Sequence, residues 1–348
     1  MWLWPSMRRI LLPSFSLIAF LIFILPCNLS YSAPTSLGPT SQEEAEILWQ
    51  DGQTSYAEDR FQDAINQLGR YVDRYPGRVG YLEAHFLLGK SYFGLKKFKE
   101  ALKSFQYYVT SKGINPTSAE ANVWVGRSYL ELRKFQEALQ VAIELDQLQA
   151  LPPEVVLWKL LIKSRALVGL RHEVKASNTI ELAEHEISES TSKALVGQIY
   201  SLKLQAKALS CARLQAVVPL EEIQALSLTE RRGTCLLETL LTFNKILKTD
   251  DPASAADAAT YLNQAFDAYR KACIHPPLPK PIPGHPRTAK QLKTYRAELS
   301  ELLLKNYREN ALHGSELLNS WKPPTSSPTY ASFLRVASRL KNPNSRTP

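Results

Sequence analysis

The chain has 348 residues, of which 45% are hydrophobic and only 14 are glycine, and its formal net charge is +9 at pH 7. This length accommodates two or three ordinary domains or one elongated repeat array. The apolar content excludes a chain that is disordered throughout, and the 22 prolines gather mainly near the ends and in two C-terminal stretches. The composition therefore predicts a folded, helix-rich body with local irregular segments.

The first 33 residues have the parts of an export signal. Two arginines form a short positive segment, an apolar run follows over 10–26, and 30–33 supplies small residues for cleavage. The apolar run is shorter than the ~20 residues that cross a bilayer, so we expect cleavage near Ser32 or Ala33 rather than a membrane anchor. Because 1–33 is a signal peptide of this kind, the mature chain is expected to be exported.

The four cysteines leave several readings open. Cys27 lies where a bacterial lipoprotein carries its acylated cysteine, but the preceding Pro26 is not the small residue that lipid attachment requires. Membrane association through Cys27, or through an uncleaved N-terminal segment, is therefore the disfavoured alternative. The spacing of Cys211, Cys235 and Cys273 is too wide for a CxxC metal or redox motif. They form either one disulfide with one free thiol or three buried thiols.

A 37-residue repeat is the clearest pattern in the sequence, because a Phe-x-acid-Ala signature recurs three times at that spacing. A glycine lies at the same distance before each alanine. The repeat-signature residues are Gly52, Gly89, Gly126, Ala64, Ala101 and Ala138. Apolar residues at helical spacing predict a helical hairpin in each unit, in which the glycine of the first helix and the alanine of the second permit a close approach. Pro76 and Pro116 separate the units.

This pattern resembles the tetratricopeptide repeat (TPR) family, in which a small residue, an aromatic, an alanine, a second aromatic and a proline recur at fixed offsets. The matching residues of the second unit are Gly89, Tyr92, Ala101, Phe105 and, displaced, Pro116. The usual period of the family is about 34 residues, and the extra residues here lie between the units. The resemblance implies an all-α fold, an α-solenoid of TPR-like hairpins with additional C-terminal helices.

Over residues 41–146 the sequence is also similar to the BamD-like and YbgF-like periplasmic branch of that family. The residues that carry this similarity are Tyr56, Phe61, Ala64, Tyr71, Tyr75, Pro76, Ala84, Leu88, Gly89 and Tyr92. In that branch, helical repeats support assembly of the outer envelope. The resemblance implies a scaffold for protein–protein interaction in the bacterial periplasm or cell envelope, with a role in outer membrane assembly.

The chain beyond the repeats reads as helical without the signature. We expect three repeats over 34–150, degenerate helical repeats over 151–273, a proline-rich strap over 274–287, and C-terminal helices with a basic tail over 288–341. The second of these segments is expected to begin with a degenerate fourth hairpin over 154–184.

Two local features stand out in the C-terminal half. Asp251 is predicted to cap a helix that has Pro252 in its first turn. Residues 274–348 include twelve basic and four acidic residues, which gives this segment a net charge of +8. A solvated tail is the expected reading of this charge, and contact with anionic lipid or an acidic partner is the alternative.

A partner is expected on the concave face that the first helix of each unit forms in such an array. The candidate partner-binding residues are Trp49, Gln53, Tyr56, Phe86, Lys90, Phe93 and Arg127. Lys90 and Arg127 occupy equivalent places in adjacent units, so their charges are predicted to meet a carboxylate of a bound protein or peptide. Solvated surface charge is the alternative for both cations, and core packing is the alternative for the aromatic residues and the favoured one for Phe86.

The sequence lacks the constellations that catalysis needs, such as Gly-x-Ser-x-Gly, His-Glu-x-x-His or a phosphate-cradling glycine loop. His275 and His285 flank the strap without a nearby third metal ligand. We therefore expect no enzymatic activity, no catalytic residues, no cofactor and no metal, and export argues against a nucleic-acid partner. The alternative function is a cell-wall-acting lyase, or its accessory subunit, built on a helical solenoid.

Overall fold

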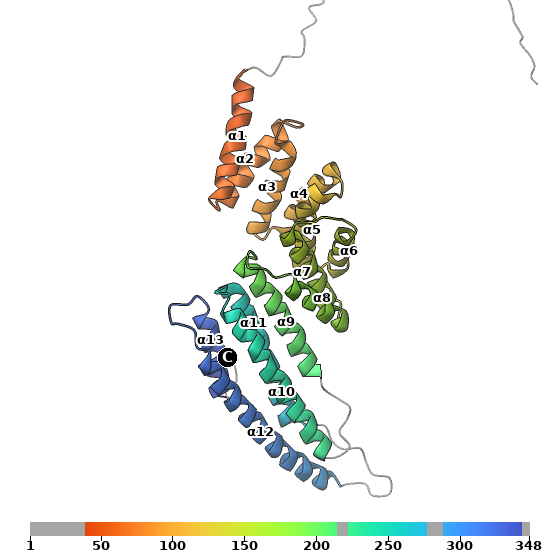
Figure 1. Ribbon diagram of the computed structural model, residues 1–348, viewed down its shortest axis with the longest axis vertical. Helices are drawn as coiled ribbons and strands as arrows, with labels where there is room; N and C mark the ends of the chain where they lie inside the picture. Colours follow the sequence, from red (N-terminus) through yellow and green to blue (C-terminus); the bar gives the residue numbers. More distant parts are fainter. Residues whose placement is uncertain (1–38, 214–221, 277–287, 343–348) are drawn as a thin grey trace, which may run out of the picture. The chain divides into compact units, whose positions relative to one another are not determined.

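The computed structural model describes residues 39–213, 222–276 and 288–342 (Figure 1). These residues form helices joined by short turns, with no β-strand among them, which confirms the predicted all-α class. The expected signal peptide, Cys27 and His285 lie outside the described residues. None of the described helices is long and apolar enough to cross a membrane.

The helices fall into a series of hairpins followed by a bundle. The hairpin helices are α1 (Pro39–Ala57), α2 (Phe61–Arg74), α3 (Tyr81–Gly94), α4 (Phe98–Lys112), α5 (Ala119–Glu131), α6 (Phe135–Asp146), α7 (Pro153–Gly169) and α8 (Glu173–His185), with a short 3₁₀ helix, η1 (Pro116–Ser118), before α5. The bundle helices are α9 (Lys193–Arg213), α10 (Glu222–Leu247), α11 (Pro252–Ile274), α12 (Ala289–Ser320) and α13 (Tyr330–Lys341).

The chain divides into two compact units, Met1–Glu44 and Ala45–Pro348. Among the described residues the first unit contributes only the beginning of α1. All the packing reported below lies within the second unit.

The same turn joins the two helices of every described hairpin from α1–α2 to α7–α8. One residue of each turn has a positive φ: Asp59 (56°), Lys96 (59°), Arg133 (57°) and Arg171 (62°). The following residue donates its backbone N–H to a carbonyl five residues earlier, as Lys97 does to Tyr92 at 2.9 Å and His172 does to Leu167 at 2.9 Å. The fourth hairpin is therefore degenerate in sequence but keeps the backbone geometry of the other three.

The signature residues lie where the helices of a hairpin cross. Ala64, Ala101 and Ala138 are fully buried. A Cβ on Gly89 would lie 2.5 Å from the ring of Phe105, and one on Gly52 would lie 2.5 Å from Leu68. The space left by these two glycines is thus filled by a large side chain one turn after the alanine.

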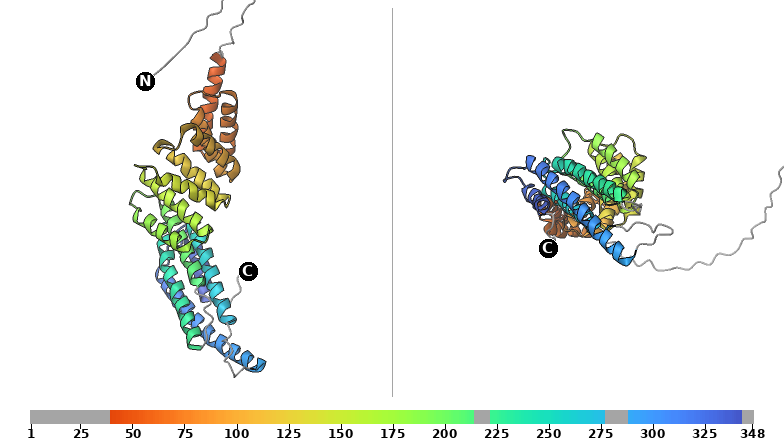
Figure 2. Two further views of the ribbon diagram at one scale, coloured as in Figure 1. Left: turned by 90° about the vertical axis from the view of Figure 1, so that its right-hand side faces the viewer. Right: turned by 90° about the horizontal axis from the view of Figure 1, so that it is seen from below.

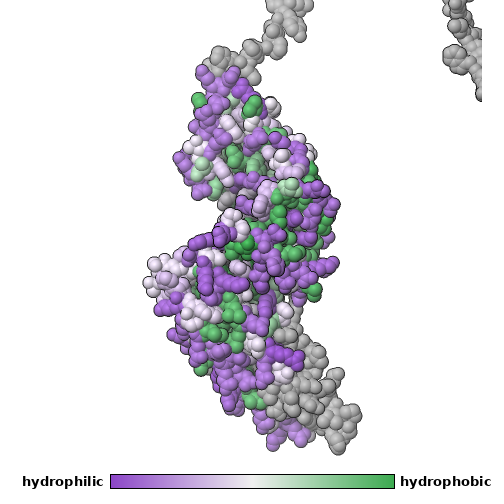
Figure 3. All heavy atoms as spheres, in the orientation of Figure 1, coloured by the Kyte–Doolittle hydropathy of each residue, from purple (hydrophilic) through white to green (hydrophobic). Residues whose placement is uncertain are grey.

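Successive hairpins stack through the contacts of α2 with α3, α4 with α5, and α6 with α7. The phenylalanine of the signature reaches the next hairpin: a Cβ on Gly94 would lie 2.7 Å from Phe61, and one on Gly169 would lie 2.6 Å from Phe135. Each hairpin therefore covers an apolar face that its neighbour leaves open, as in other repeat arrays. In Figure 3, apolar residues gather over α5 to α8 on an otherwise largely hydrophilic face.

The bundle packs around one continuous core. Helix α9 contacts α10 and α11, and α12 contacts α10, α11 and α13 (Figures 1 and 2). The largest buried side chains of this core are Phe243, Phe266, Tyr307 and Phe333.

A disulfide links Cys211, at the end of α9, to Cys235 on α10, with a Cα–Cα distance of 5.7 Å. Cys273 on α11 is a buried free thiol. Burial raises the pKa of this thiol to about 12. Of the two readings that the sequence left open, the structure therefore contains the disulfide with one free cysteine.

Asp251 caps the N-terminus of α11, since its carboxylate accepts a hydrogen bond from the backbone N–H of Ser254 at 3.0 Å. Pro252 occupies the first turn of the same helix. This confirms the predicted start of α11.

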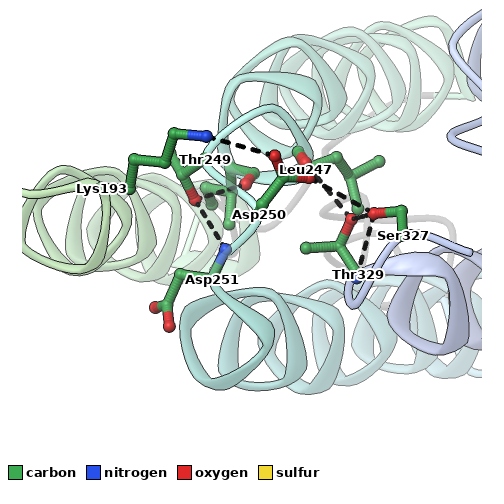
Figure 4. Close-up of polar contacts among 8 residues, drawn as sticks. Lys193, Leu247, Thr249, Asp250, Asp251, Ser327 and Thr329 are labelled. Atoms are coloured by element: carbon green, nitrogen blue, oxygen red, sulfur yellow. Dashed lines mark hydrogen bonds and ion pairs between the residues drawn. The ribbon is translucent and has the colours of Figure 1, made fainter.

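The turn between α10 and α11 also holds the loop that precedes α13 (Figure 4). The hydroxyl of Thr329 donates to the backbone carbonyl of Leu247 at 3.2 Å, and the hydroxyl of Ser327 donates to Asp250 at 3.4 Å. The other carboxylate oxygen of Asp250 lies 3.4 Å from Nζ of Lys193, at the beginning of α9. One turn therefore connects three segments that are distant in the sequence.

Candidate functional site

The candidate residues of the first hairpin pack within that hairpin. Trp49 is half-buried, and its ring centroid lies 5.7 Å from that of Tyr71. The ring of Tyr56 lies 6.1 Å from that of Phe61, between the two helices. Gln53 is exposed. Trp49 and Tyr56 therefore contribute to packing, and neither lies in the cavity described below.

Lys90 in the second hairpin is engaged by the protein itself. Its Nζ lies 2.9 Å from Oε1 of Glu120 on α5, and it lies 4.4 Å above the ring of Phe86. Phe86 in turn contacts Phe105 at a centroid distance of 5.8 Å. Lys90 therefore joins α3 to α5 and does not offer a free charge.

Arg127 on α5 is held between two indole rings. Its Cζ lies 3.9 Å from the ring centroid of Trp124 and 4.1 Å from that of Trp158 on α7. Phe93 lies further away, with its ring centroid 5.0 Å from Cζ. A cation–π contact engages the face of the guanidinium, so its N–H donors, which lie in its plane, can still bind other partners.

Both indoles are fixed by carboxylates in the same way. Nε1 of Trp124 donates to Glu120 at 3.4 Å, and Nε1 of Trp158 donates to Glu154 at 3.4 Å. In each case the acceptor lies one helical turn earlier. Trp124 also stacks on Phe105 of α4, with ring centroids 5.7 Å apart. The two walls around the guanidinium are therefore positioned by α4, α5 and α7 before any ligand arrives.

Burial, together with the nearby charge of Arg165, lowers the pKa of Arg127 to about 10. The group is still protonated at neutral pH. No hydrogen bond or ion pair joins the Arg127 guanidinium to another residue of the described ranges, although Glu120 and Glu154 lie at the same cavity. Because Arg127 is half-buried and its donors have no acceptor among the described residues, its guanidinium is available to bind one.

The guanidinium faces a cavity of about 460 Å³ between α5 and α7, which we call the Arg127 pocket. It is lined by Glu120, Val123, Trp124, Arg127, Glu154 and Trp158, among others. This volume suits one or two side chains of a bound segment. The lining offers planar N–H donors between apolar ring faces, which is the chemistry that a carboxylate or carbonyl oxygen with an apolar neighbour requires.

Two further cavities of similar size lie elsewhere. One of about 440 Å³ is bordered by α4, α5 and α6, and one of about 450 Å³ by α8 and α9. Neither is lined by an arginine. In the described ranges no group of three or more His, Cys, Asp or Glu residues could hold a metal ion.

The structure brings together only part of the predicted set. Lys90, Phe93 and Arg127 gather around Trp124. Only Arg127 of the predicted set lines the pocket, and the residues that do not are Trp49, Gln53, Tyr56, Phe86, Lys90 and Phe93. Two essential members, Trp124 and Trp158, were missed by the sequence analysis. The sequence nevertheless contains a signal for both residues. Trp124 lies three residues before Arg127 on the same helix face, and each of the two tryptophans follows a glutamate by four residues, Glu120 and Glu154.

Neither a protein-family model nor a curated protein sequence matches this chain. In structure it is similar to the C-terminal part of a TPR repeat-containing protein from Cytophaga hutchinsonii, with 10% sequence identity over 86% of this chain and 96% of that one and a TM-score of 0.39. So distant a likeness carries no argument by itself. The TPR-like description therefore depends on the 37-residue repeat and on the shared turn of the stacked hairpins.

Proposed function

We propose that this protein is an exported, non-catalytic scaffold that binds another protein or a peptide along α3, α5 and α7, with the Arg127 pocket as its anchor. The observation that carries this proposal is the guanidinium of Arg127, which is fixed between two indoles and has no acceptor within the described residues. A helical-repeat fold commonly serves protein recognition along the first helices of its hairpins.

The pocket is prepared for binding at low entropic cost. Trp124 and Trp158 already hold the guanidinium in one orientation, so a ligand does not have to order a flexible arginine. The planar donors fit the two oxygens of a carboxylate, as from an acidic side chain or a chain terminus. We therefore assign the main contact to Arg127, while Lys90 orders one edge of the pocket through Glu120.

Two observations support an exported location. The disulfide between Cys211 and Cys235 is of a kind that persists in oxidising compartments such as the bacterial periplasm. The N-terminal segment over 1–33 has the pattern of an export signal. Together with the resemblance over 41–146 to the BamD-like and YbgF-like branch, these features lead us to propose a role in cell-envelope or outer membrane assembly.

The proposal is tested by placing a photo-crosslinking amino acid at Thr117, on the rim of the Arg127 pocket, in the full-length chain expressed in its native cells. We expect crosslinks to one or a few envelope proteins. Arg127→Ala should reduce their yield by about tenfold, as expected for loss of a charge-assisted contact. Arg127→Lys should restore only part of it, because an ammonium lacks the planar pair of donors.

Arg308→Ala is the matched control, since Arg308 is an exposed arginine of α12 that does not line the pocket. Crosslinks that survive Arg127→Ala unchanged would contradict the assigned anchor. A lyase would release soluble fragments from purified cell wall. Such release by the wild-type chain would contradict a non-catalytic role.

A further inference from the structure

The hairpin turns carry a repeated pattern of exposed positive charge. In the second, third and fourth hairpins the residue with positive φ is a cation: Lys96, Arg133 and Arg171. Residues with a Cβ are disfavoured in this left-handed conformation, in which glycine or asparagine is the usual choice. All three side chains are exposed, and none makes an ion pair or hydrogen bond to another described residue. Each cation follows the C-cap of a helix and offsets the negative end of that helix dipole, but it is paired with no carboxylate among the described residues.

A second basic residue follows each of these cations. These residues are Lys97, Lys134 and His172, and all three are exposed. Carboxylates do occur nearby, as Glu100, Glu137 and Glu173, but they lie in the first turn of the following helix, where they offset the positive end of the helix dipole. The first hairpin differs, because Asp59 has the positive φ and Arg60 pairs with Glu58 at 2.6 Å.

Neighbouring turns lie against each other. Nζ of Lys97 lies 3.5 Å from Oε1 of Gln62 in the preceding hairpin, next to the contact between Phe61 and Gly94. The contact of Phe135 with Gly169 brings the third turn to the fourth in the same manner. The six basic residues 96, 97, 133, 134, 171 and 172 therefore follow one edge of the stacked hairpins, and we call them the turn row.

The turn row has the features of a surface that binds its partner through charge rather than through shape complementarity. Its residues line none of the three cavities described above. Of the exposed large apolar side chains in the described ranges, only Val174 lies within two residues of the row in the sequence, so the row carries no cluster of apolar anchors of the kind around which a protein interface is built. Exposed cations that recur once in each hairpin instead suit a layer of mobile anionic headgroups, which can move to match each charge.

We propose that the turn row binds the surface of an anionic lipid bilayer. The array then meets the membrane through its hairpin turns, while the Arg127 pocket, which is lined mainly by the N-terminal parts of α5 and α7, stays accessible to a protein partner. This inference does not depend on the proposed function, because no residue of the turn row lines the pocket. Each cation near such a surface contributes on the order of 1 kcal/mol, which corresponds to about a fivefold gain in binding.

The test is flotation of the full-length chain with phosphatidylcholine vesicles that either contain or lack about one third of phosphatidylglycerol, at low salt and at about 0.15 M salt. The test variant is the triple substitution Lys96→Gly, Arg133→Gly and Arg171→Gly. Glycine suits the left-handed turn, so this variant is expected to fold. The matched control is Lys248→Ala, Lys271→Ala and Lys305→Ala, which removes the same charge from exposed positions of the bundle.

We expect the wild type to bind anionic vesicles at least about a hundredfold more strongly than neutral ones at low salt, with the difference decreasing as salt rises. The triple glycine variant should lose about a hundredfold of that binding at low salt, because it removes three cations that each contribute about fivefold, and the control variant should lose less than about twofold. Equal binding to both vesicle types, or equal losses in both variants, would overturn the proposal. So would binding to soluble polyglutamate that depends on the turn row in the absence of any preference for anionic vesicles, because the occupant would then be an acidic polypeptide.

Discussion

The stacked hairpins and the C-terminal bundle use helices in different ways. From α1 to α8 the apolar residues form several small clusters, each shared between neighbouring helices, and the same turn recurs in every described hairpin. From α9 to α13 one cluster extends through all the helices, and a disulfide and the turn around Asp250 tie distant segments together. The hairpins therefore vary their surface repeat by repeat, whereas the bundle is expected to unfold as one unit.

Truncation of a core aromatic residue should show this difference most strongly. Phe243→Ala in α10 and Phe105→Ala in α4 each remove a fully buried ring and are expected to cost about 3–5 kcal/mol of folding free energy. Hydrogen exchange should report lost protection throughout α9–α13 for Phe243→Ala, but mainly in α3 to α6 for Phe105→Ala. Loss of protection across both regions in either variant would mean that they unfold together.

Removal of the disulfide is expected to affect only the bundle. Its closed loop has a sequence separation of 24 residues, for which the chain-entropy estimate is about 3 kcal/mol. Replacement of Cys211 and Cys235 by alanine should lower the denaturant midpoint of the bundle, while the hairpin transition stays in place. Cys273→Ala, which leaves the bond intact, is the control, and an equal loss in that variant would refute a role for the cross-link.

A methyl group added at the hairpin crossing should disturb a single repeat. Gly89→Ala places a Cβ 2.5 Å from the ring of Phe105, and overpacking of this kind costs about 1–3 kcal/mol. Gly69→Ala is the matched control, because a Cβ there meets nothing within 4 Å. Thermal unfolding should show destabilisation in the first variant only. If both variants were equally stable, the close contact at Gly89 would be of no consequence.

Alkaline pH should weaken the bundle through Cys273. Burial raises the pKa of this thiol from 9.0 to about 12, so the native state keeps its proton while the unfolded state loses it. The contribution is fully present below pH 9 and is lost as the pH rises towards 12. Unfolding midpoints measured across this window should fall more steeply for the wild type than for Cys273→Ala. Parallel slopes would show that the thiol does not titrate differently on unfolding.

The smallest effect is expected at a hairpin turn. Lys96→Gly relieves a left-handed conformation but gives the unfolded chain more freedom, so the net change in stability should stay below about 1 kcal/mol. Lys96→Val, which is β-branched, should be clearly less stable than the wild type. Equal stability of the glycine and valine variants in denaturant titrations would contradict the assigned turn geometry.

The repeat was readable from the sequence because it is a local and periodic signal. Gly89, Ala101 and the proline breaks placed the hairpins, and Asp251 with Pro252 placed the start of α11. The site was only half predictable. Register alone identified Arg127, but its stacking depends on Trp158, which comes from the next hairpin and reaches the guanidinium only through the packing of α5 against α7.

The pairing of the cysteines was undetermined for a similar reason. Sequence spacing gives no distance between the end of α9 and the middle of α10, and only the bundle brings Cys211 and Cys235 together. The fourth hairpin shows the opposite case. Its Phe-x-acid-Ala signature is lost, yet Arg171 and His172 keep the turn, because the backbone needs only the left-handed residue and the N–H that follows it.

The guanidinium of Arg127 links two hairpins at the pocket that we propose as the binding site. One indole comes from the third hairpin and the other from the fourth, so the side chain of Arg127 connects the two hairpins. A ligand that draws the guanidinium outward weakens its contacts with the two indoles, and one that presses it inward strengthens them. Ligand binding and the packing of α5 against α7 are then coupled. Whatever changes the stability of this packing changes the affinity for the ligand, and the ligand changes the stability of the packing by the same factor.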